Sequence, residues 1–240
     1  MAVIQKLCCK VQRLVDHGEH VYTIDLVSDK LFPIFKPGQF LHLALDAYDP
    51  AGYWPDSRVF SIASPPHQRE RLSITYSVRG RFTARMEEEL TEGKTVWVKM
   101  PYGEFTIQAM GDVVLLAGGT GITPFIAFLS GLSVNFTQKI YLAYGARTAD
   151  LLIYRNPIDQ CAKKARHLRQ WYFVEEGHVD PSLTGPILGK LSVKDIWGQI
   201  DDPFASMFYL SGPPDMIKTI SHDLKDRGVG IDAIRVDAWE

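Results

Sequence analysis

The amino-acid sequence predicts two domains of different fold class: a six-stranded antiparallel β-barrel, then an α/β domain with a doubly wound parallel sheet. Short alternating segments separated by turn residues fill the first part of the chain, as in small barrels. From Val113 onward, apolar strands alternate with helical segments, which favours a parallel sheet. The 240 residues suffice for two domains of ordinary size, which we place at 1–108 and 109–240.

The barrel is predicted from strands in which apolar and polar residues alternate, most visibly in Phe40–Leu45. One helix is expected at Thr83–Leu90, and the irregular segment Asp46–Ser57 is expected to be a surface loop. The six expected strands are Ile4–Leu14, His20–Val27, Gln39–Leu45, Arg58–Ala63, Leu72–Val78 and Thr95–Met100.

The second domain is predicted from apolar runs that alternate with helical segments after a link at 108–112. Strands are expected at 113–117, 139–144, 170–174, 206–211 and 231–236. Helices are expected near 124–133, 157–168, 192–198 and 214–227. Strands and helices in this order predict right-handed crossovers and a parallel sheet.

A glycine-rich turn follows the first strand of the α/β domain. Its residues Gly118, Gly119 and Gly121 allow sharp turning and close approach of a ligand, while Thr123 suits an N-cap and Pro124 the first helical position. A strand, glycine loop and helix N-terminus form a site for phosphate. The loop is not the G-x-G-x-x-G fingerprint, and a tight structural turn is the alternative.

A second loop of this kind, Ser211-Gly212-Pro213-Pro214, follows another apolar strand and opens a helix. Loops at strand ends line the ligand crevice of an open α/β sheet. Asp237 and Trp239 bring a carboxylate and an aromatic ring to the end of the sequence. The tryptophan either docks into a site or only covers an apolar area of the surface.

Two further motifs lie in the barrel. In Arg58-Val59-Phe60-Ser61, alternation directs Arg58 and Phe60 to one face; an arginine can hold a phosphate and an aromatic ring can stack on a planar ligand. Between Tyr76 and Thr83 a strand turns at Gly80 into a helix, whose free N–H groups can bind a second phosphate. The alternatives are an ordinary strand and an ordinary capped helix.

Composition excludes several other classes. A net charge of −2 gives no reason to expect nucleic acid, and no apolar run approaches the ~20 residues that span a membrane. Three cysteines favour a reducing cytoplasm and are one short of a usual iron–sulfur ligand set. His17 and His20 lack further ligands, so no metal site is expected. There is no G-x-S-x-G elbow.

Taken in order, these motifs resemble the ferredoxin–NADP reductase superfamily, over nearly the whole chain from Lys36 to Trp239. The resemblance implies a barrel that binds FAD non-covalently and an α/β domain that binds a nicotinamide dinucleotide. It also implies that hydride passes from the nicotinamide to the flavin.

The resemblance assigns roles in the barrel by position. Arg58 matches the arginine that meets the FAD pyrophosphate, Phe60 replaces the tyrosine that packs on the flavin, and Ser61 matches the serine near the reactive flavin nitrogen. Gly80 opens the turn that holds the pyrophosphate. The remaining matched residues line the flavin, its ribityl chain or that turn: Val59, Tyr76, Ser77, Val78, Arg79, Phe82 and Thr83.

In the α/β domain the resemblance implies a dinucleotide pyrophosphate above the glycine loop Gly118, Gly119, Thr120, Gly121, Thr123 and Pro124. Ser211, Gly212 and Pro213 match a Cys-Gly-Pro-Pro motif beside the nicotinamide, with serine in place of cysteine. Asp237 and Trp239 match a terminal carboxylate and an aromatic that covers the flavin. The resemblance thus implies that Ser61, Ser211, Asp237 and Trp239 surround the reacting rings.

The expected function is that of an FAD-dependent NAD(P)H oxidoreductase delivering electrons to a separate carrier, such as a ferredoxin, flavodoxin or oxygenase component. The alternatives are an NAD(P)H:flavin reductase that releases its flavin and a flavin-binding electron-transfer subunit of a larger complex. Glu175 and Glu176 follow the strand near the adenosine ribose and favour NADH, because carboxylates accept from a 2′-hydroxyl and repel a 2′-phosphate. Arg147, after the preceding strand, favours NADPH.

Overall fold

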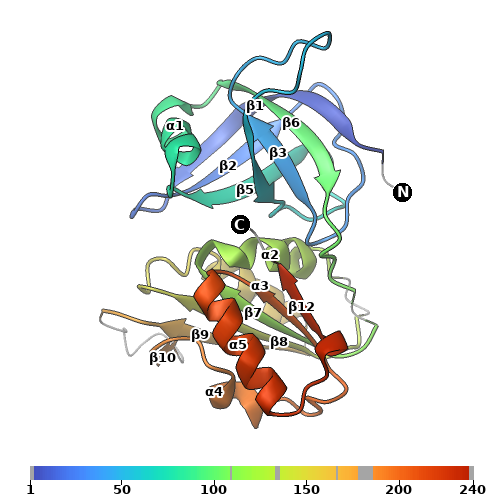
Figure 1. Ribbon diagram of the computed structural model, residues 1–240, viewed down its shortest axis with the longest axis vertical. Coiled ribbons are helices and arrows are strands. Elements are labelled where there is room, and N and C mark those ends of the chain that lie inside the picture. The colour runs from blue at the N-terminus through green and yellow to red at the C-terminus, as the bar shows by residue number, and fades with distance from the viewer. Residues whose placement is uncertain (1–2, 109, 133–135, 166, 178–185, 238–240) are drawn as a thin grey trace. The chain divides into compact units, whose positions relative to one another are not determined.

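A computed structural model describes residues 3–108, 110–132, 136–165, 167–177 and 186–237. The chain divides into two compact units, one of residues up to Thr106 with Ile126–Gly131, the other of Ile107–Phe125 and residues from Leu132 onward. The predicted fold class is confirmed, because the first unit carries an antiparallel six-stranded sheet and the second a parallel one (Figure 1).

The first unit is a nearly closed barrel. Its sheet has the order β4-β3-β6-β1-β2-β5, and the edges β4 and β5 are joined by a bridge from Ile62 to Ile74 and a hydrogen bond from the Ala63 N–H to the Ser73 carbonyl (2.8 Å). The strands are β1 (Gln5–Asp16), β2 (Val21–Val27), β3 (Phe40–Ala44), β4 (Ser57–Ser61), β5 (Arg71–Ser77) and β6 (Thr95–Tyr102).

Alternation decides which residues fill the barrel. Ile24, Leu41 and Ile74 are fully buried and belong to one apolar core. The helix α1 (Arg81–Glu89) covers this core through its buried residues Phe82 and Met86, which stand four apart on one helical face. The start of α1 is thereby fixed against the barrel.

The second unit has the sheet order β10-β9-β8-β7-β11-β12, with every described pair parallel. The chain runs outward from β7 through β8 and β9, then returns to place β11 on the other side of β7. The strands are β7 (Val113–Gly118), β8 (Ile140–Ala146), β9 (Leu168–Val174), β10 (Pro186–Leu188), β11 (Met207–Ser211) and β12 (Ile234–Asp237). Between β7 and β11 lies the switch point at which such sheets bind ligands.

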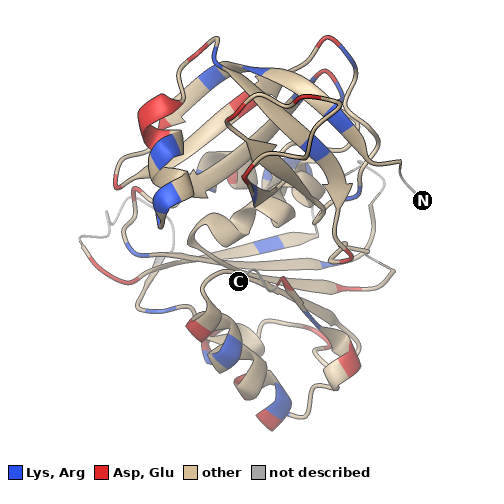
Figure 2. Cartoon of the chain, turned by 45° about the horizontal axis from the view of Figure 1, so that its top comes forward, with Lys and Arg blue, Asp and Glu red and all other residues tan. Residues whose placement is uncertain are grey.

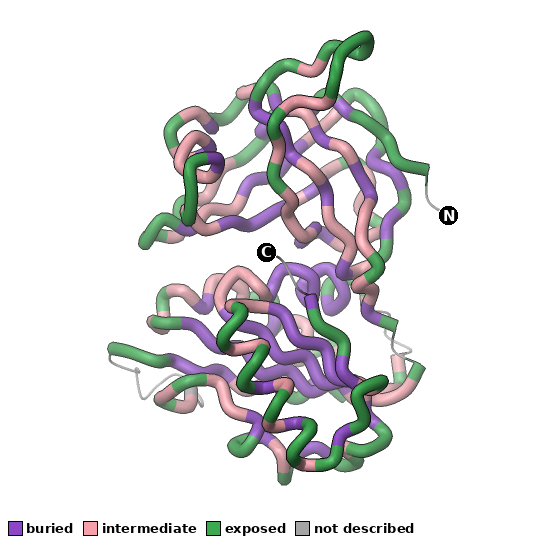
Figure 3. The backbone as a smooth tube through the Cα atoms, viewed as in Figure 1, coloured by how far each residue is buried: buried purple, intermediate pink, exposed green. Residues whose placement is uncertain are grey.

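Helices cover both faces of the parallel sheet, which explains why its central strands are apolar throughout. All residues of β7 and β8 are buried (Figure 3). Helices α4 (Val193–Trp197) and α5 (Pro214–Asp226) pack on one core that includes Leu116, and α3 (Arg155–Lys164) lies behind the sheet in Figure 1. The remaining helix, α2 (Thr123–Ser130), follows β7. None of the helices in the described ranges is long and apolar enough to cross a membrane.

The structure differs from expectation at several element ends. Strand β10 was not predicted, because three residues that begin with proline carry no periodicity; it pairs with β9 at the sheet edge, where proline is tolerated. Helix α3 ends at Lys164, not at 168, because Ala165 is extended and β9 already begins at Leu168. Strand β1 continues two residues beyond Leu14 to complete its pairing with β2.

Candidate functional site

In the first unit, the structure brings the predicted Arg58–Ser61 strand against the start of α1. The Cζ atom of Arg58 lies 5.4 Å from the ring centroid of Phe82. Its Nη1 donates hydrogen bonds to the Ser57 carbonyl (2.9 Å) and to Asp56 Oδ1 (3.2 Å). The side chain is held at the helix terminus while 55% of its surface stays exposed, so it remains open to an anion.

Helix α1 begins two residues earlier than expected. The helix begins at Arg81 after Gly80, not at Thr83, which lies within the first turn. Thr83 Oγ1 accepts hydrogen bonds from the N–H groups of Arg79 (2.9 Å) and Gly80 (3.1 Å) and donates to the Gly80 carbonyl (3.0 Å). Thr83 therefore fixes the turn preceding the helix. The N–H groups of Arg81 and Phe82 belong to the start of the helix, where the first N–H groups have no intrahelical acceptor.

The charges on α1 run against the helix dipole. Acidic residues are normally favoured near a helix N-terminus and basic ones near its C-terminus. Here Arg79 and Arg81 flank the N-terminus, and the last turn carries Glu87, Glu88 and Glu89 (Figure 2). With Arg58 added, cations gather where the dipole is already positive. A bound phosphate would neutralise this arrangement, which supports the predicted pyrophosphate site.

A buried hydroxyl without a partner lies next to Phe60. Tyr76 is 2% exposed, and its ring centroid lies 6.0 Å from that of Phe60 and 5.5 Å from that of Tyr22. In the described part of the chain, no group pairs with Tyr76 Oη. An unsatisfied buried polar group costs about 1–3 kcal/mol. The ribityl hydroxyls of FAD are suitable partners, so these residues fit the implied cofactor.

The other predicted barrel residues separate by face. On the neighbouring strand β3, the buried Leu43 is paired with Arg58 and the buried Leu41 with Phe60, so both β4 residues lie on the core side of the sheet. Val59 and Ser61 lie on the outer side, opposite His42 and Phe40. At the end of β5, Ser77 and Val78 are half-buried, and the Val78 N–H donates to the His20 carbonyl (2.9 Å). The side chain of Ser61 is thus directed away from that of Arg58.

In the second unit, the glycine loop is itself helical. Gly119–Ile122 form a 3₁₀ turn that runs directly into α2. The expected N-cap role of Thr123 is wrong: its φ of −56° and ψ of −46° are helical, and its Oγ1 donates to the Thr120 carbonyl (3.0 Å). The helical segment therefore starts at Gly119, directly after β7, and Pro124 lies inside it.

The glycine loop and the Ser211–Pro214 loop lie against each other, because β7 and β11 are neighbours with Ala117 paired to Ser211. A Cβ atom on Gly121 would lie 2.4 Å from the Ser211 carbonyl oxygen. A Cβ atom on Gly212, whose φ is +152°, would lie 2.9 Å from the Gly118 nitrogen. Close approach of two backbones therefore requires these glycines.

Gly119 differs from the other loop glycines. Its φ is +54°, and no described atom lies within 4 Å of the place where a Cβ would stand. Gly119 is therefore the residue at which the loop backbone is open to a ligand. The positive φ explains the glycine locally, and the open space fits the predicted pyrophosphate.

Two predicted residues at the ends of adjacent strands form a buried pair. Ser211 and Asp237 are opposite each other on β11 and β12, and each is 2% exposed. Ser211 Oγ donates a hydrogen bond of 2.9 Å to Asp237 Oδ2. The carboxylate thus orients the serine hydroxyl beside the switch point of the sheet. Trp239, predicted with them, lies outside the described residues.

The residues predicted to select the coenzyme lie farther along the same edge. The Glu175 N–H donates to the Ala146 carbonyl (3.1 Å) and the Glu176 N–H to the Arg147 carbonyl (2.8 Å). Pairing of β8 with β9 thus continues beyond the strand ends and brings Glu176 beside Arg147. All three charged residues are exposed.

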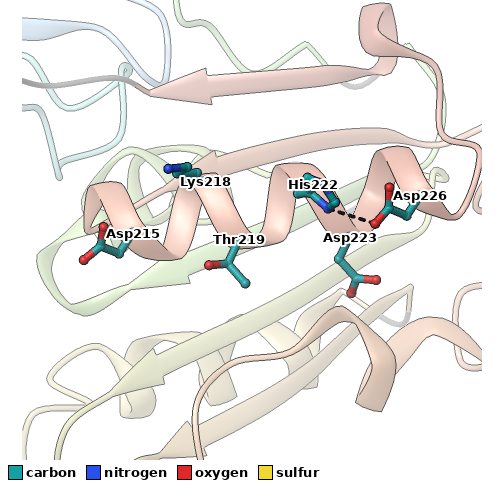
Figure 4. A pocket seen from close by; sticks show the side chains of 6 residues that line it. All are labelled: Asp215, Lys218, Thr219, His222, Asp223 and Asp226. Carbon is teal, nitrogen blue, oxygen red and sulfur yellow. Dashed lines mark ion pairs between the residues drawn. The ribbon is translucent and has the colours of Figure 1, made fainter.

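A surface pocket lies away from the predicted residues, on one side of α5 (Figure 4). His222 Nδ1 and Asp226 Oδ2 are 2.8 Å apart within it. Its lining comes from that helix alone: Asp215, Lys218, Thr219, His222, Asp223 and Asp226. Across the described ranges, no three His, Cys, Asp or Glu residues are grouped to hold a metal. The pocket therefore adds nothing to the candidate site.

The chain is similar to known oxidoreductases. Residues 115–222 match the family model described as an oxidoreductase NAD-binding domain. The chain is 29% identical over 237 residues to the reductase component of propane 2-monooxygenase from Rhodococcus jostii, covering 90% of this chain and 60% of that relative. It is 30% identical over 216 residues to the reductase component DmpP of phenol 2-monooxygenase from Pseudomonas, covering 86% and 58%. The chain therefore spans about 60% of these relatives.

Solved structures share the fold of the entire chain. The FAD/NAD-binding domain of a Vibrio cholerae nitric oxide dioxygenase has a TM-score of 0.82 at 17% identity, covering 97% of this chain and 98% of that one. A ferredoxin–NADP⁺ reductase of Neisseria gonorrhoeae with bound FAD and NADP has a TM-score of 0.78 at 17% identity, covering 99% of both. The chain therefore carries a match to an oxidoreductase NAD-binding domain over residues 115–222 and shares the fold of the FAD/NAD-binding domain and of the ferredoxin–NADP⁺ reductase.

Proposed function

We propose that the chain is an FAD-dependent NAD(P)H oxidoreductase that passes electrons to a separate carrier protein. Residues 1–108 hold FAD non-covalently in this proposal, and residues 109–240 hold the nicotinamide dinucleotide. Bound FAD supplies a flavin that accepts a hydride and gives up electrons singly or in pairs.

The observation that carries the proposal is the start of α1. Arg58 lies against Phe82, Arg79 and Arg81 flank the terminus, and the first N–H groups of the helix have no intrahelical acceptor. These groups bind and orient an anion of the size of a pyrophosphate. The unpaired Tyr76 hydroxyl supplies a second polar contact nearby, beside the ring of Phe60.

The α/β residues orient the second nucleotide. The open backbone at Gly119 receives the pyrophosphate, and the interlocked loops hold the nicotinamide end at the switch point of the sheet. Asp237 fixes the direction of the Ser211 hydroxyl, which contacts the nicotinamide. Restricting the bound ring in this way contributes to the rate by lowering the entropy lost on reaching the reactive geometry.

The electron acceptor that the relatives favour is an oxygenase component. The propane and phenol monooxygenase relatives are reductase components, and the chain spans most of its own length in both matches. A ferredoxin or flavodoxin is the other acceptor class for this chemistry. Any one-electron metal centre in the pathway is supplied by the partner or by a part of the protein beyond these residues.

Purification followed by a redox assay tests the proposal. The protein should be yellow, release FAD on denaturation and oxidise NAD(P)H with ferricyanide as artificial acceptor. A screen with ferredoxin, flavodoxin, oxygenase components, cytochromes and free flavins then identifies the acceptor class.

The two alternatives give different results in the same assay. A colourless protein whose NAD(P)H oxidation requires added flavin is an NAD(P)H:flavin reductase, in which flavin is a released substrate. A yellow protein that oxidises neither NADH nor NADPH is an electron-transfer subunit. Either result contradicts the proposed function.

A further inference from the structure

Met216, in the first turn of α5, fills the space between the two nucleotide loops. A Cβ atom on Gly118 would lie 2.6 Å from Met216 Sδ, and a Cβ atom on Gly212 would lie 2.7 Å from Met216 Cε. The end of one side chain therefore contacts both glycines, which belong to different loops. The same side chain packs on the core formed with α4 and α5.

The geometry explains why a long, unbranched side chain suits this site. The sheet brings the two loops together through the β7–β11 pairing, but that pairing ends at Ala117 and Ser211. Beyond it, the Met216 thioether lies between Gly118 and Gly212, and Pro213 Cδ also approaches Gly118. Methionine has three rotatable side-chain bonds and a polarizable sulfur, so it fits an irregular gap that a branched residue fills poorly.

We propose that Met216 is a positioning residue for the nicotinamide, acting by setting the separation of the Gly118 and Gly212 loops. The inference rests on the proposed function and deepens it, because the Met216 side chain contacts one glycine of each nucleotide loop. Sequence reasoning missed Met216, since an apolar residue in the first turn of an amphipathic helix indicates only core packing.

The first test compares Met216→Ala with Met216→Leu and with Ile220→Ala, which empties part of the same core from the same helix. Shifts of about 1 Å at a reactive site can cost up to about a hundredfold in rate. Met216→Ala should therefore raise the KM for NAD(P)H and the Kd for NAD(P)⁺ roughly tenfold or more, without weakening FAD binding. Met216→Leu should restore most of the affinity, and Ile220→Ala should lower the Tm without changing the KM.

A second test enlarges the side chain at Gly118 and shortens the one at Met216. Gly118→Ala places a methyl group 2.6 Å from Met216 Sδ, which is too close, so it should raise the KM by itself. Adding Met216→Ala should lower the KM again, and such non-additivity is expected only of residues in contact. In the double variant the KM should return only part of the way to its original value, because the new methyl group also approaches Pro213 Cδ at 2.8 Å. Independent, additive effects of the two substitutions would contradict the proposal.

The outcomes separate this inference from the proposed function. If the unmodified protein neither binds nor oxidises a nicotinamide nucleotide, both fail. If the unmodified protein is active, and the KM of Met216→Ala equals that of Ile220→Ala, the proposed function stands and only the positioning role of Met216 is wrong. Should Met216→Ala not fold, Met216→Val also leaves the Sδ and Cε space empty, and an unchanged KM in that variant overturns the inference.

Discussion

The guanidinium of Arg58 lies over the ring of Phe82, with 5.4 Å between Cζ and the ring centroid. Phe82 is buried in the first turn of α1, so the contact fixes an exposed cation at a helix N-terminus. Charge and helix dipole both favour an anion there. The arrangement converts two ordinary elements, an edge strand and a short helix, into one phosphate-binding unit.

Arg58→Ala should weaken FAD binding roughly ten- to a hundredfold, because a hydrogen bond to a charged group contributes about 1.5–3 kcal/mol. Titration of flavin-depleted protein with FAD, followed by flavin fluorescence, measures the change. Arg13→Ala, which removes an exposed arginine from β1, serves as the control. Unchanged FAD affinity in Arg58→Ala would remove Arg58 from the site.

Tyr76→Phe should act in opposite directions on the two forms of the protein. Without flavin, removal of a buried unpaired hydroxyl should raise the free energy of unfolding by about 1 kcal/mol. With flavin, the same change should weaken FAD binding, since the hydroxyl loses its ligand partner. Thermal unfolding of both forms measures the two effects together. Equal stabilisation of the flavin-free and flavin-bound forms would mean that Tyr76 does not face the cofactor.

His20 and Glu87 connect the turn after β1 to α1, with 2.7 Å between Nδ1 and Oε1. The hydrogen bond to Glu87 raises the pKa of His20 above its usual 6.5, and nearby Asp16 adds to the effect. The hydrogen bonds from His20 and Tyr22 lower the pKa of Glu87 below its usual 4.5. The ion pair is therefore lost as the pH rises through the His20 pKa and as it falls through the Glu87 pKa.

His20→Asn should consequently lower the Tm most near pH 5.5 and progressively less as the pH rises through the raised pKa of His20, above which the unmodified histidine is neutral. Asparagine suits the test because it tolerates the positive φ of 60° at this residue. The exposed His67 provides the matched control through His67→Asn. A Tm difference that does not depend on pH would show that the ion pair contributes nothing.

Features that depend on residues close together in the sequence could be predicted, whereas those that depend on residues far apart could not. Alternation in Phe40–Leu45 and the apolar run Val113–Ala117 are local patterns, and both produce the expected strands. The N-cap role of Thr123 was wrong, because a hydroxyl has several possible partners and its Oγ1 bonds to the Thr120 carbonyl; Thr83 does cap α1, but from within the first turn of the helix. Met216 was missed because its role depends on Gly118, about a hundred residues away, which only the folded sheet brings near.

Coenzyme selection depends on charges at the edge of the parallel sheet. Arg147 follows β8, directly next to β7 and its glycine loop, whereas Glu175 and Glu176 follow β9, one strand farther out. A carboxylate accepts a hydrogen bond from the 2′-hydroxyl of NADH and repels the 2′-phosphate of NADPH. The backbone bond from the Glu176 N–H to the Arg147 carbonyl holds the two main-chain segments together at this edge.

We expect a higher kcat/KM with NADH than with NADPH, since two carboxylates oppose one guanidinium. Glu175→Ser/Glu176→Arg should shift the preference toward NADPH, and Arg147→Ala should strengthen the preference for NADH. The shifts should be modest and should decrease at high ionic strength, because exposed charges are screened by salt. Steady-state kinetics with both coenzymes at two salt concentrations measure them. If the unmodified protein uses NADPH equally well or better, Arg147 and not the glutamates decides the choice, and Arg147→Ala should then abolish NADPH use.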